Sequence, residues 1–597
     1  MPEYLAPGVY VEETSFRAKS IEGVGTSTTA FVGPTRRGPI GGTPEMVTSL
    51  PDFERLYGSL ENLGFGDVSD AARKLNFVAH AARAYFDNGG SRLYIARAAN
   101  AAATASGLLR DGAGTPGEEA RLRARFPGAA YNGRAYLREA ARPATVRTLS
   151  TAPEGSLLRI VVGGAETLYL KTAGVWADSA AAPLSLVDGG GAPLAPETTP
   201  GGVGAKADLL SLAVEVVDAD GYAQAWEGLG HAAAHPRALA AVLAHNPANR
   251  ADALANMIWA DIGADVSAFE LRVAVLALPA LAGDNDGRRV LALTTGSDGS
   301  APISGAETTP GSYAAAFAQL SGLEDVAIVA APGSSAYADA QAIQNALIGH
   351  AEKRRAYRIA VLDAQPNQTP GQMREARGRI DSKYAALYYP WVMVSNPLSR
   401  PGRDDIPREI ALPPSGFVSG IYARNDTQRG VHKAPANEVV SGALRFESDI
   451  NFAQQELLNP LGVNCLRYLS GRGYRVWGAR LASSDPEWKY VSDRRYFNYL
   501  EASIDRGTQW AVFEPNGERL WANIRQTISD FLYNEWKNGA LLGTSAEQAF
   551  FVRCDRSTMT QNDLDNGRLI CLIGVAIIKP AEFVIFRIGQ KTADAQN

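Results

Sequence analysis

The hydrophobic pattern changes several times along the chain, and each change predicts a different kind of structure. Near the start, Val9 and Val11 alternate with Tyr10 and Glu12, which is the two-residue period of a β-strand. After this arm, residues 28–32 and 92–97 predict two strands. Between them, residues 70–86 predict a helix with Ser69 as its N-cap.

The middle of the chain has a different composition. Residues 100–120 and 186–207 are rich in Ala, Gly and Thr, and the segment between them contains short apolar runs such as 157–162 and 167–171. Pro and Gly at the ends of these runs indicate a small β-rich unit rather than a βα repeat. Residues 287–313 predict a further linker, rich in Gly, Ser and Thr.

From about residue 320, short apolar runs alternate with longer segments of helical spacing. Strands are predicted at residues 326–330, 359–362 and 386–394. Helices are predicted between them, at residues 336–354 and 371–383. Strands joined by helical crossovers imply a parallel sheet that is mostly buried.

The last third contains one long amphipathic helix, predicted at residues 519–537 and followed by Gly539 as a cap. Ser545 and Gln548 have the spacing of a capping box for a short helix. Three strands are predicted after it, at residues 550–554, 569–578 and 583–588.

The composition fits a large folded chain and argues against several functional classes. Of 597 residues, 46% are hydrophobic and 20% charged, which excludes a disordered chain. The formal net charge of −5 argues against a nucleic-acid partner. Three cysteines without a CxxC motif argue against a metal or redox site. No apolar run has the length of a membrane helix and no signal peptide is visible, so we expect cytoplasmic folding and no membrane insertion.

Motifs for catalysis are weak. His231 and His235 have a metal-helix spacing, but a proline directly follows the second histidine. The glycine-rich residues 201–206 lack the phosphate-loop pattern. Asp363 ends a predicted parallel strand, where α/β sheets bind ligands, so an α/β hydrolase-like enzyme using residues 320–400 is the alternative. We favour a cap or turn role for this aspartate, and predict no catalytic, cofactor-binding or metal-ligating residue and no cofactor.

The last predicted strand is apolar on both faces. Phe583 and Ile585 lie on one face, whereas Val584, Phe586 and Ile588 lie on the other. Such a strand needs sheet neighbours, because an unpaired apolar edge in water promotes aggregation. It either folds onto its own domain or is donated to a neighbouring chain as an added strand.

Many motifs in residues 1–100 and 320–590 occur in a fixed order. They read PGVYVEE (7–13), TAFVGPTRRG (29–38), ALYYPW (386–391), PPSGFVSGIYAR (413–424), RGVHKAPANE (429–438), LNPLGVN (458–464), RGYRVWGAR (472–480), SSDPEWKYVSDRR (483–495), QWAVFEP (509–515), GALLG (539–543), AFFVRCD (549–555) and IGVAIIKPAEFVIFRI (573–588). Together they resemble the contractile tail sheath proteins of bacteriophages and of phage-derived contractile injection systems. Residues 100–320 fit poorly, and the family's inserted region varies and tends to lie outside the assembled sheath.

The resemblance implies a structural subunit and no enzyme. Subunits of this family stack as hexameric rings around an inner tube, between a baseplate and a tail terminator, and the helical sheath contracts to drive the tube through a target envelope. The particle, a phage tail or an injection device, is assembled in the bacterial cytoplasm. Each terminal arm adds a strand to the C-terminal sheet of another subunit. The interface residues carried over are Val9, Tyr10, Val11, Glu12, Phe583, Val584, Ile585, Phe586 and Ile588.

The predicted fold is multidomain and mixes α/β and α+β classes. An α/β sheet domain and a C-terminal α+β domain form the body, with an inserted β-rich outer domain and extended β arms at both ends. The predicted ranges are an N-terminal arm (1–25), a first core segment (26–100), the insert (101–285), the α/β core (286–445), the C-terminal domain (446–578) and a C-terminal arm (579–597). The helix at 519–537 is either a core helix, which we favour, or an element that faces the tube.

Overall fold

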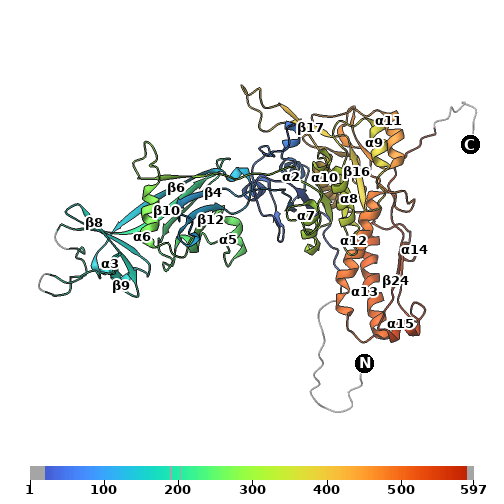
Figure 1. Cartoon of the computed structure of the whole chain (residues 1–597). Helices are drawn as coiled ribbons and strands as arrows, with labels where there is room; N and C mark the ends of the chain where they lie inside the picture. The colour runs from blue at the N-terminus through green and yellow to red at the C-terminus, as the bar shows by residue number, and fades with distance from the viewer. Residues whose placement is uncertain (1–19, 189–190, 202–203, 588–597) are drawn as a thin grey trace, which may run out of the picture.

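The computed structural model describes residues 20–188, 191–201 and 204–587. It is an elongated molecule with a central α/β body, from which a β-rich part extends to the left in Figure 1. A helical part that contains α12 and α13 extends downward from the same body (Figure 1). The mixture of several sheets and helices agrees with the predicted α/β and α+β classes.

The central body is built on a nine-stranded sheet in the order β19–β22–β21–β16–β15–β14–β1–β3–β2. Six strands run parallel: β1 (Thr29–Gly33), β3 (Leu93–Arg97), β14 (Ile328–Ala330), β15 (Ile359–Asp363), β16 (Ala385–Tyr389) and β21 (Val463–Leu469). Short antiparallel strands complete the edges: β2 (Glu45–Val47), β19 (Glu438–Val439) and β22 (Gly473–Val476). The parallel sheet predicted from the alternating pattern is confirmed.

Helices cover both faces of this sheet, because successive residues of a strand point to opposite sides. Phe31 of β1 belongs to one core, together with α1 (Leu50–Tyr57), α2 (Phe77–Asp87) and α10 (Pro414–Arg429). Its neighbours Ala30 and Val32 belong to the other core, together with α7 (Tyr313–Gln319), α8 (Ala340–Ala351), α9 (Pro370–Arg377) and α11 (Phe452–Leu458). A small sheet of β17 (Val392–Ser395), β18 (Glu409–Leu412) and β20 (Arg445–Phe446) lies beside the body.

Several predicted boundaries in this body are wrong. The helix predicted at 70–86 begins at Phe77, because the Asn76 side chain accepts a bond from a backbone N–H and caps it there. The preceding residues form a separate turn capped by Asp70 rather than by Ser69. The strand predicted at 386–394 is two strands of two sheets, since Pro390 lies between β16 and β17 and cannot donate to a ladder.

The β-rich part has two sheets of its own. The larger sheet contains β6 (Gly133–Pro143), β7 (Leu157–Val162), β8 (Ala165–Thr172), β9 (Val175–Ala177), β10 (Lys206–Val217), β11 (Ala223–Leu229) and β13 (Arg289–Leu293). The smaller contains β4 (Ser106–Arg110), β5 (Ala120–Ala124) and β12 (Ile258–Ile262). Short helices accompany them: α3 (Val146–Thr151), α4 (Leu239–Val242), α5 (Arg250–Ala255) and α6 (Ala268–Ala277). The strands predicted at 157–162 and 167–171 are present, whereas β13 lies in a segment predicted as linker.

The helical part is formed by α12 (Val491–Gly507), α13 (Glu518–Lys537), α14 (Ala546–Ala549) and α15 (Gln561–Asp565), with β23 (Phe550–Arg553) and β24 (Leu572–Val575). The helix predicted at 519–537 is confirmed, and it buries one apolar face. The predicted capping box is wrong: Ser545 makes no side-chain cap bond, and the Gln548 side chain accepts a bond from the Thr544 hydroxyl (2.9 Å) instead. Within the described ranges, no helix combines the length and the apolarity needed to cross a bilayer.

Candidate subunit interface

The two strands of the C-terminal sheet leave both of their outer edges unpaired. In an antiparallel pair, residues that bond across the pair alternate with residues whose backbone groups point outward. The Ala576 N–H donates to the Ala549 carbonyl (2.8 Å), so the backbone groups of every second residue before Ala576 also point toward β23. The backbone groups of Ile573 and Val575 therefore point away from β23. In the described part of the chain, no backbone bond joins these outward groups to another strand. The sheet presents two edges that can accept further strands.

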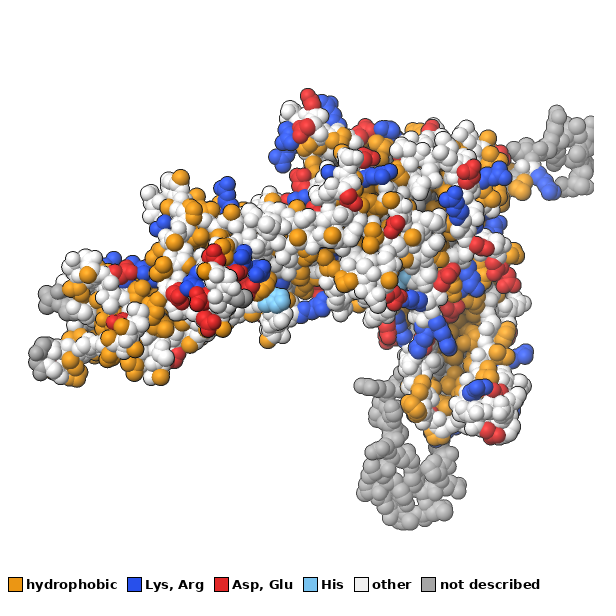
Figure 2. All heavy atoms as spheres, viewed as in Figure 1, with side chains coloured by type: hydrophobic (Ala, Val, Ile, Leu, Met, Phe, Trp, Pro, Cys, Tyr) orange, Lys and Arg blue, Asp and Glu red, His pale blue; other side chains and the backbone are white. Residues whose placement is uncertain are grey.

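One face of this small sheet packs on the protein and the other is exposed. Phe550, Val552 and Val575 contact the core formed by α13. The opposite face shows Phe551, half exposed at 51%, and Leu572 at 50%. Figure 2 shows hydrophobic side chains gathered on the surface of this helical part. An apolar surface beside an open strand edge is the structure that strand addition requires.

The apolar part of the C-terminal arm, residues 583–587, pairs with no strand of the described chain. The strand predicted at 583–588 does not form in the described residues 583–587. The exposed fractions of Phe583, Val584, Ile585 and Phe586 are 69, 69, 79 and 82%. Four consecutive large apolar side chains on the surface are unfavourable in water, so we interpret this segment as one that needs a partner. Ile588, the last predicted interface residue, lies outside the described residues.

A charged cluster holds the chain just before this arm. The Arg480 guanidinium donates to both carboxylate oxygens of Glu582, at 2.7 and 2.6 Å. The same carboxylate accepts bonds from the Asn459 amide (2.8 Å) and the Tyr490 hydroxyl (2.9 Å), and Lys489 lies 3.6 Å away. Burial alone would raise the pKa of Glu582, but these hydrogen bonds outweigh it and lower the pKa to about 2. The carboxylate therefore stays charged and bonded at neutral pH.

The N-terminal interface residues predicted from the sequence, Val9 to Glu12, lie outside the described residues. The described chain begins as an extended segment against α12. Ile21 is buried beside Gly507, and the Val24 N–H donates to the Ser503 hydroxyl (3.1 Å). Gly23 approaches Tyr499 so closely that a Cβ atom would lie 2.2 Å from its hydroxyl. The segment before β1 is thus fixed on the helical part.

Asp363, the alternative catalytic candidate, is a helix cap. Its two carboxylate oxygens accept bonds from the Ser415 N–H and hydroxyl, both at 2.7 Å, at the start of α10. Burial raises the pKa of Asp363 to about 7, against the opposing effect of the two bonds. The geometry agrees with the cap role that the sequence favoured.

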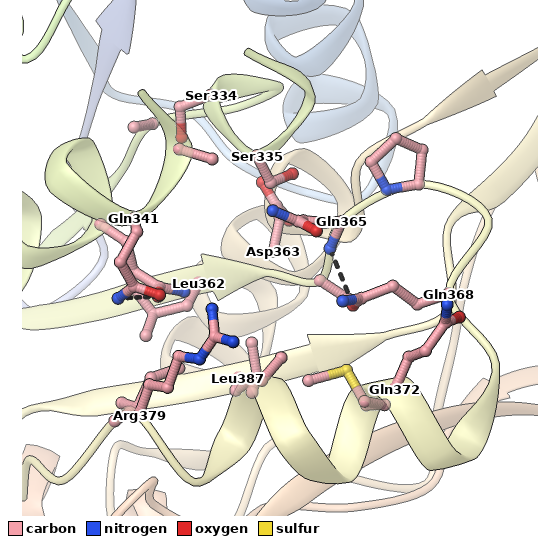
Figure 3. A pocket seen from close by; sticks show the side chains of 18 of the residues that line it. Ser334, Ser335, Gln341, Leu362, Asp363, Gln365, Gln368, Gln372, Arg379 and Leu387 are labelled. Atoms are coloured by element: carbon pink, nitrogen blue, oxygen red, sulfur yellow. Dashed lines mark hydrogen bonds between the residues drawn. The ribbon is translucent and has the colours of Figure 1, made fainter. Parts of the chain in front are cut away.

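Asp363 also lines a cavity of about 330 Å³ at the carboxyl ends of β15 and β16. Figure 3 shows this cavity between α8 and α9, with Gln341, Gln365, Gln368 and Arg379 around it. Most of its polar lining consists of uncharged amides and hydroxyls. Amides are poor proton donors and acceptors in catalysis, so this lining does not favour acid–base chemistry beside Asp363.

The remaining sequence candidates do not come together as a site. His231 is buried at 6% exposure, and burial lowers its pKa to about 4. His235 lies in the loop before Arg237, whose N–H donates to its ring (3.1 Å). Across the described ranges, no group of three or more potential ligands is placed to hold a metal ion. Glu582 and Arg480 were not predicted as interface residues, because 102 positions separate them and no spacing rule connects them.

Two family models match the C-terminal half of the chain. Residues 306–480 match the phage tail sheath protein central domain, and residues 483–591 match the phage tail sheath C-terminal domain. A prophage major tail sheath protein of Pseudomonas aeruginosa is 27% identical over 267 residues, 44% of this chain and 64% of that protein. The tail sheath protein of Vibrio phage KVP40 is 23% identical over 188 residues, 31% of this chain and 27% of that protein. The chain thus spans less than two thirds of these relatives.

Two solved structures share the fold over nearly the whole chain. The first is a PVC sheath complex of an extracellular contractile injection system in its contracted state, with a TM-score of 0.53, 19% identity and 99% of each chain covered. The second is the helical sheath of the anti-feeding prophage in its contracted state, with a TM-score of 0.51, 21% identity and coverage of 98% and 99%. Residues 306–480 and 483–591 therefore resemble the central and C-terminal domains of phage tail sheath proteins.

Proposed function

We propose that this chain is the structural subunit of a contractile sheath, in a phage tail or an injection particle. Copies stack as hexameric rings around an inner tube, and rearrangement of the subunits drives the tube through a target envelope. The observation that carries the proposal is that two features occur in the same chain. Residues 583–587 are an exposed apolar segment, and the two-stranded sheet has unpaired outer edges in the described residues. The role is structural rather than catalytic and needs no cofactor, consistent with the cap role of Asp363.

Each open sheet accepts two strands from other copies. One is the N-terminal segment with Val9 and Val11, and the other is the C-terminal segment with Phe583 and Ile585. Donation between copies explains why the second segment is exposed in a single chain. Each added strand contributes several backbone hydrogen bonds at about 1 kcal/mol net each, and each buried apolar side chain adds about 1.5–3 kcal/mol before ordering costs.

The other partners follow from the same role. The inner surface of the sheath contacts a tube protein, and its ends contact a baseplate and a terminator. The two similar structures are a sheath complex and a helical sheath, which supports self-assembly here. The division into arms, core, insert and C-terminal domain, with the limits given above, is part of the proposal. Assembly takes place in the bacterial cytoplasm, without nucleic acid or membrane insertion.

The test compares one arm substitution with a matched substitution in the insert. Ile585→Asp places a charge in the arm, where the side chain is 79% exposed in the single chain and buried in the proposed added strand. We expect a folded monomer without tubes in negative-stain microscopy, as for a chain truncated after Glu582. Val175→Asp, at a side chain 54% exposed on the β-rich part, is the control and leaves tubes intact. Tubes of normal length from Ile585→Asp would contradict strand donation.

A further inference from the structure

The segments next to the two terminal arms are both held by one helix, α12. At its start, the hydroxyl of the N-cap residue Tyr490 donates to Glu582, which precedes the apolar part of the C-terminal arm. At its last turns, Ser503 and Gly507 contact Val24 and Ile21, in the segment that follows the N-terminal arm. The 17 residues of α12 span about 25 Å, since an α-helix rises 1.5 Å per residue.

We propose that α12 is a strut that holds the exit points of the two arms at a fixed separation, with Glu582 and Arg480 as the positioning pair at one end. This inference rests on the proposed function, because it concerns the arms that link copies of the chain. It deepens that function by assigning the mechanical connection between one neighbour and the next to a single helix.

The contacts at the C-terminal exit fix both the direction and the position of the chain. A bidentate pair between a guanidinium and a carboxylate is directional, unlike a single ion pair. The Arg480 backbone is itself fixed, because its N–H donates to the Asn464 amide oxygen (2.6 Å) and its carbonyl accepts from the same side chain (2.8 Å). Asn464 lies in β21 of the central sheet. The C-terminal exit is therefore tied to the strut and to the central body at once.

The N-terminal exit has an equivalent connection. Arg495 of α12 donates to the Thr26 carbonyl (3.1 Å) and forms a buried ion pair with Asp426 of α10 (2.5 Å). The Asp426 carboxylate also accepts a bond from the Thr26 hydroxyl (2.6 Å). A force on the N-terminal arm is thus transmitted to α12 and to the helix that covers the central sheet. Arg495 lies near the start of α12, and near its other end the Arg506 guanidinium donates to the carbonyl of Glu324, which precedes β14, so the helix contacts the central body at both ends.

The fixed separation has a consequence for a contracting lattice. The two exit points keep their distance while the subunit rotates as a unit, so movement is confined to the arms themselves. Within the C-terminal arm, Lys579 and Pro580 precede Glu582, which Arg480 holds, so the chain is fixed up to this residue. Phe583 and the residues after it are free to change direction.

The separation is measured by double electron–electron resonance between spin labels at Glu22→Cys and Ala581→Cys, both on the fixed sides of their exits. Both positions are exposed, and Cys571 is replaced by Ser to avoid labelling it. The labelled full-length chain is diluted with unlabelled chain, so that only distances within one copy are recorded. We expect a single narrow distance distribution, which Glu582→Gln and Arg480→Gln each broaden at least two-fold.

Asp505→Asn is the matched control. It removes the bidentate pair between Asp505 of α12 and Arg355, and the partners of the Asp505 side chain, Arg355, Tyr357 and Gln509, belong to neither exit segment. We expect the narrow distribution to remain. A distance distribution of unchanged width in both Glu582→Gln and Arg480→Gln would overturn the proposed strut. Equal broadening of the distribution in the Asp505→Asn control would overturn it as well. Thermal unfolding of each variant separates a local change at the exit from loss of the fold.

The outcomes for the strut and for the proposed function are distinguishable. If truncation after Glu582 leaves tubes of normal length, the donated strand is wrong, whatever the spin-label distances are. If truncation abolishes tubes and the distances do not respond to Glu582→Gln, the strut is wrong and strand donation stands. Arg480→Lys, which keeps the charge but not the two-bond geometry, is expected to give an intermediate width.

Discussion

The inserted β-rich part and the C-terminal part complete their sheets in opposite ways. In the insert, β6 and β10 pair along ten residues, further strands extend the sheet on both sides, and two apolar cores lie within it. In the C-terminal part, β23 and β24 pair along four residues and no further strand joins them in the described chain. The sheets of the insert are completed within the described chain, whereas the C-terminal sheet keeps unpaired edges there, to which we propose that other copies add strands.

The junction between the insert and the body is also complete within one chain. The Arg36 guanidinium pairs with both oxygens of Asp220, and both side chains are about nine-tenths buried. The Asp298 carboxylate accepts bonds from the N–H groups of Gly64 and Ala129, at 2.7 and 2.8 Å. Substitutions in the insert should therefore change stability, whereas substitutions at the open sheet should change assembly.

The largest effect is expected at the outer edge of β24. Ile573→Pro removes an N–H that points away from β23, so no bond between described residues is lost. We expect the monomer to fold and tubes to be absent in negative-stain microscopy, because the edge loses a backbone donor that an incoming strand would bond. Ile573→Val keeps the N–H and should assemble normally. Tubes from the proline variant would show that this edge stays free in the sheath.

The opposite result is expected at the junction of the insert. Asp220→Ala leaves the buried Arg36 without its partner and should lower the free energy of unfolding by about 3 kcal/mol. Tubes should still form below the unfolding temperature. Urea denaturation gives the first quantity and microscopy the second, with Asp405→Ala, in the exposed pair with Arg403, as a control without measurable effect. Loss of tubes from a folded Asp220→Ala chain would contradict the separation of roles.

Where alternating or helical patterns were strong, the fold could be predicted from the sequence. The parallel strands of the body and the helix at 519–537 are found close to their predicted positions. Helix α10 was missed because it is buried almost all around and has no polar face. Its Gly416 lies so close to α2 that a Cβ atom would be 2.7 Å from Ala81. Close packing, rather than helix propensity, decides this element.

Helix α12 was missed for a different reason. Its first turns contain Asp493, Arg494 and Arg495, a run of charges that is typical of a solvated face, yet all three are at most 3% exposed. The Arg494 guanidinium donates to Asn498 and Glu501, both at 2.8 Å, and lies over the ring of Trp488 at 4.3 Å, so the buried charge is stabilised. Among the proposed interface residues, the apolar segment 583–587 could be recognised from its two-faced pattern, and its role in an interface stays a prediction. The pair of Glu582 and Arg480 depends on folding and could not be recognised in this way.

An effect that depends on pH is expected at the cap of α10, in the body that carries both regions. The pKa of Asp363 in the folded state is about 7, above its value in the unfolded chain, so the folded state binds this proton more tightly than the unfolded state does. Stability should therefore fall as the pH rises from about 4 to 7, by up to about 4 kcal/mol. Asp363→Asn should flatten this dependence in urea denaturation of the monomeric Ile585→Asp chain. An equally steep dependence in the variant would contradict the assignment.

The smallest effect is expected beside the open sheet itself, at Ser545. Its hydroxyl makes no cap bond, and the Gln548 amide oxygen accepts bonds from Thr544 instead. Ser545→Ala should therefore change the unfolding temperature by less than a degree, whereas Thr544→Val removes a bond and should lower stability by about 1 kcal/mol. Thermal unfolding of both variants in the Ile585→Asp background compares them without assembly. If Ser545→Ala destabilises more than Thr544→Val, the capping box predicted from the sequence holds, and the start of β23 depends on it.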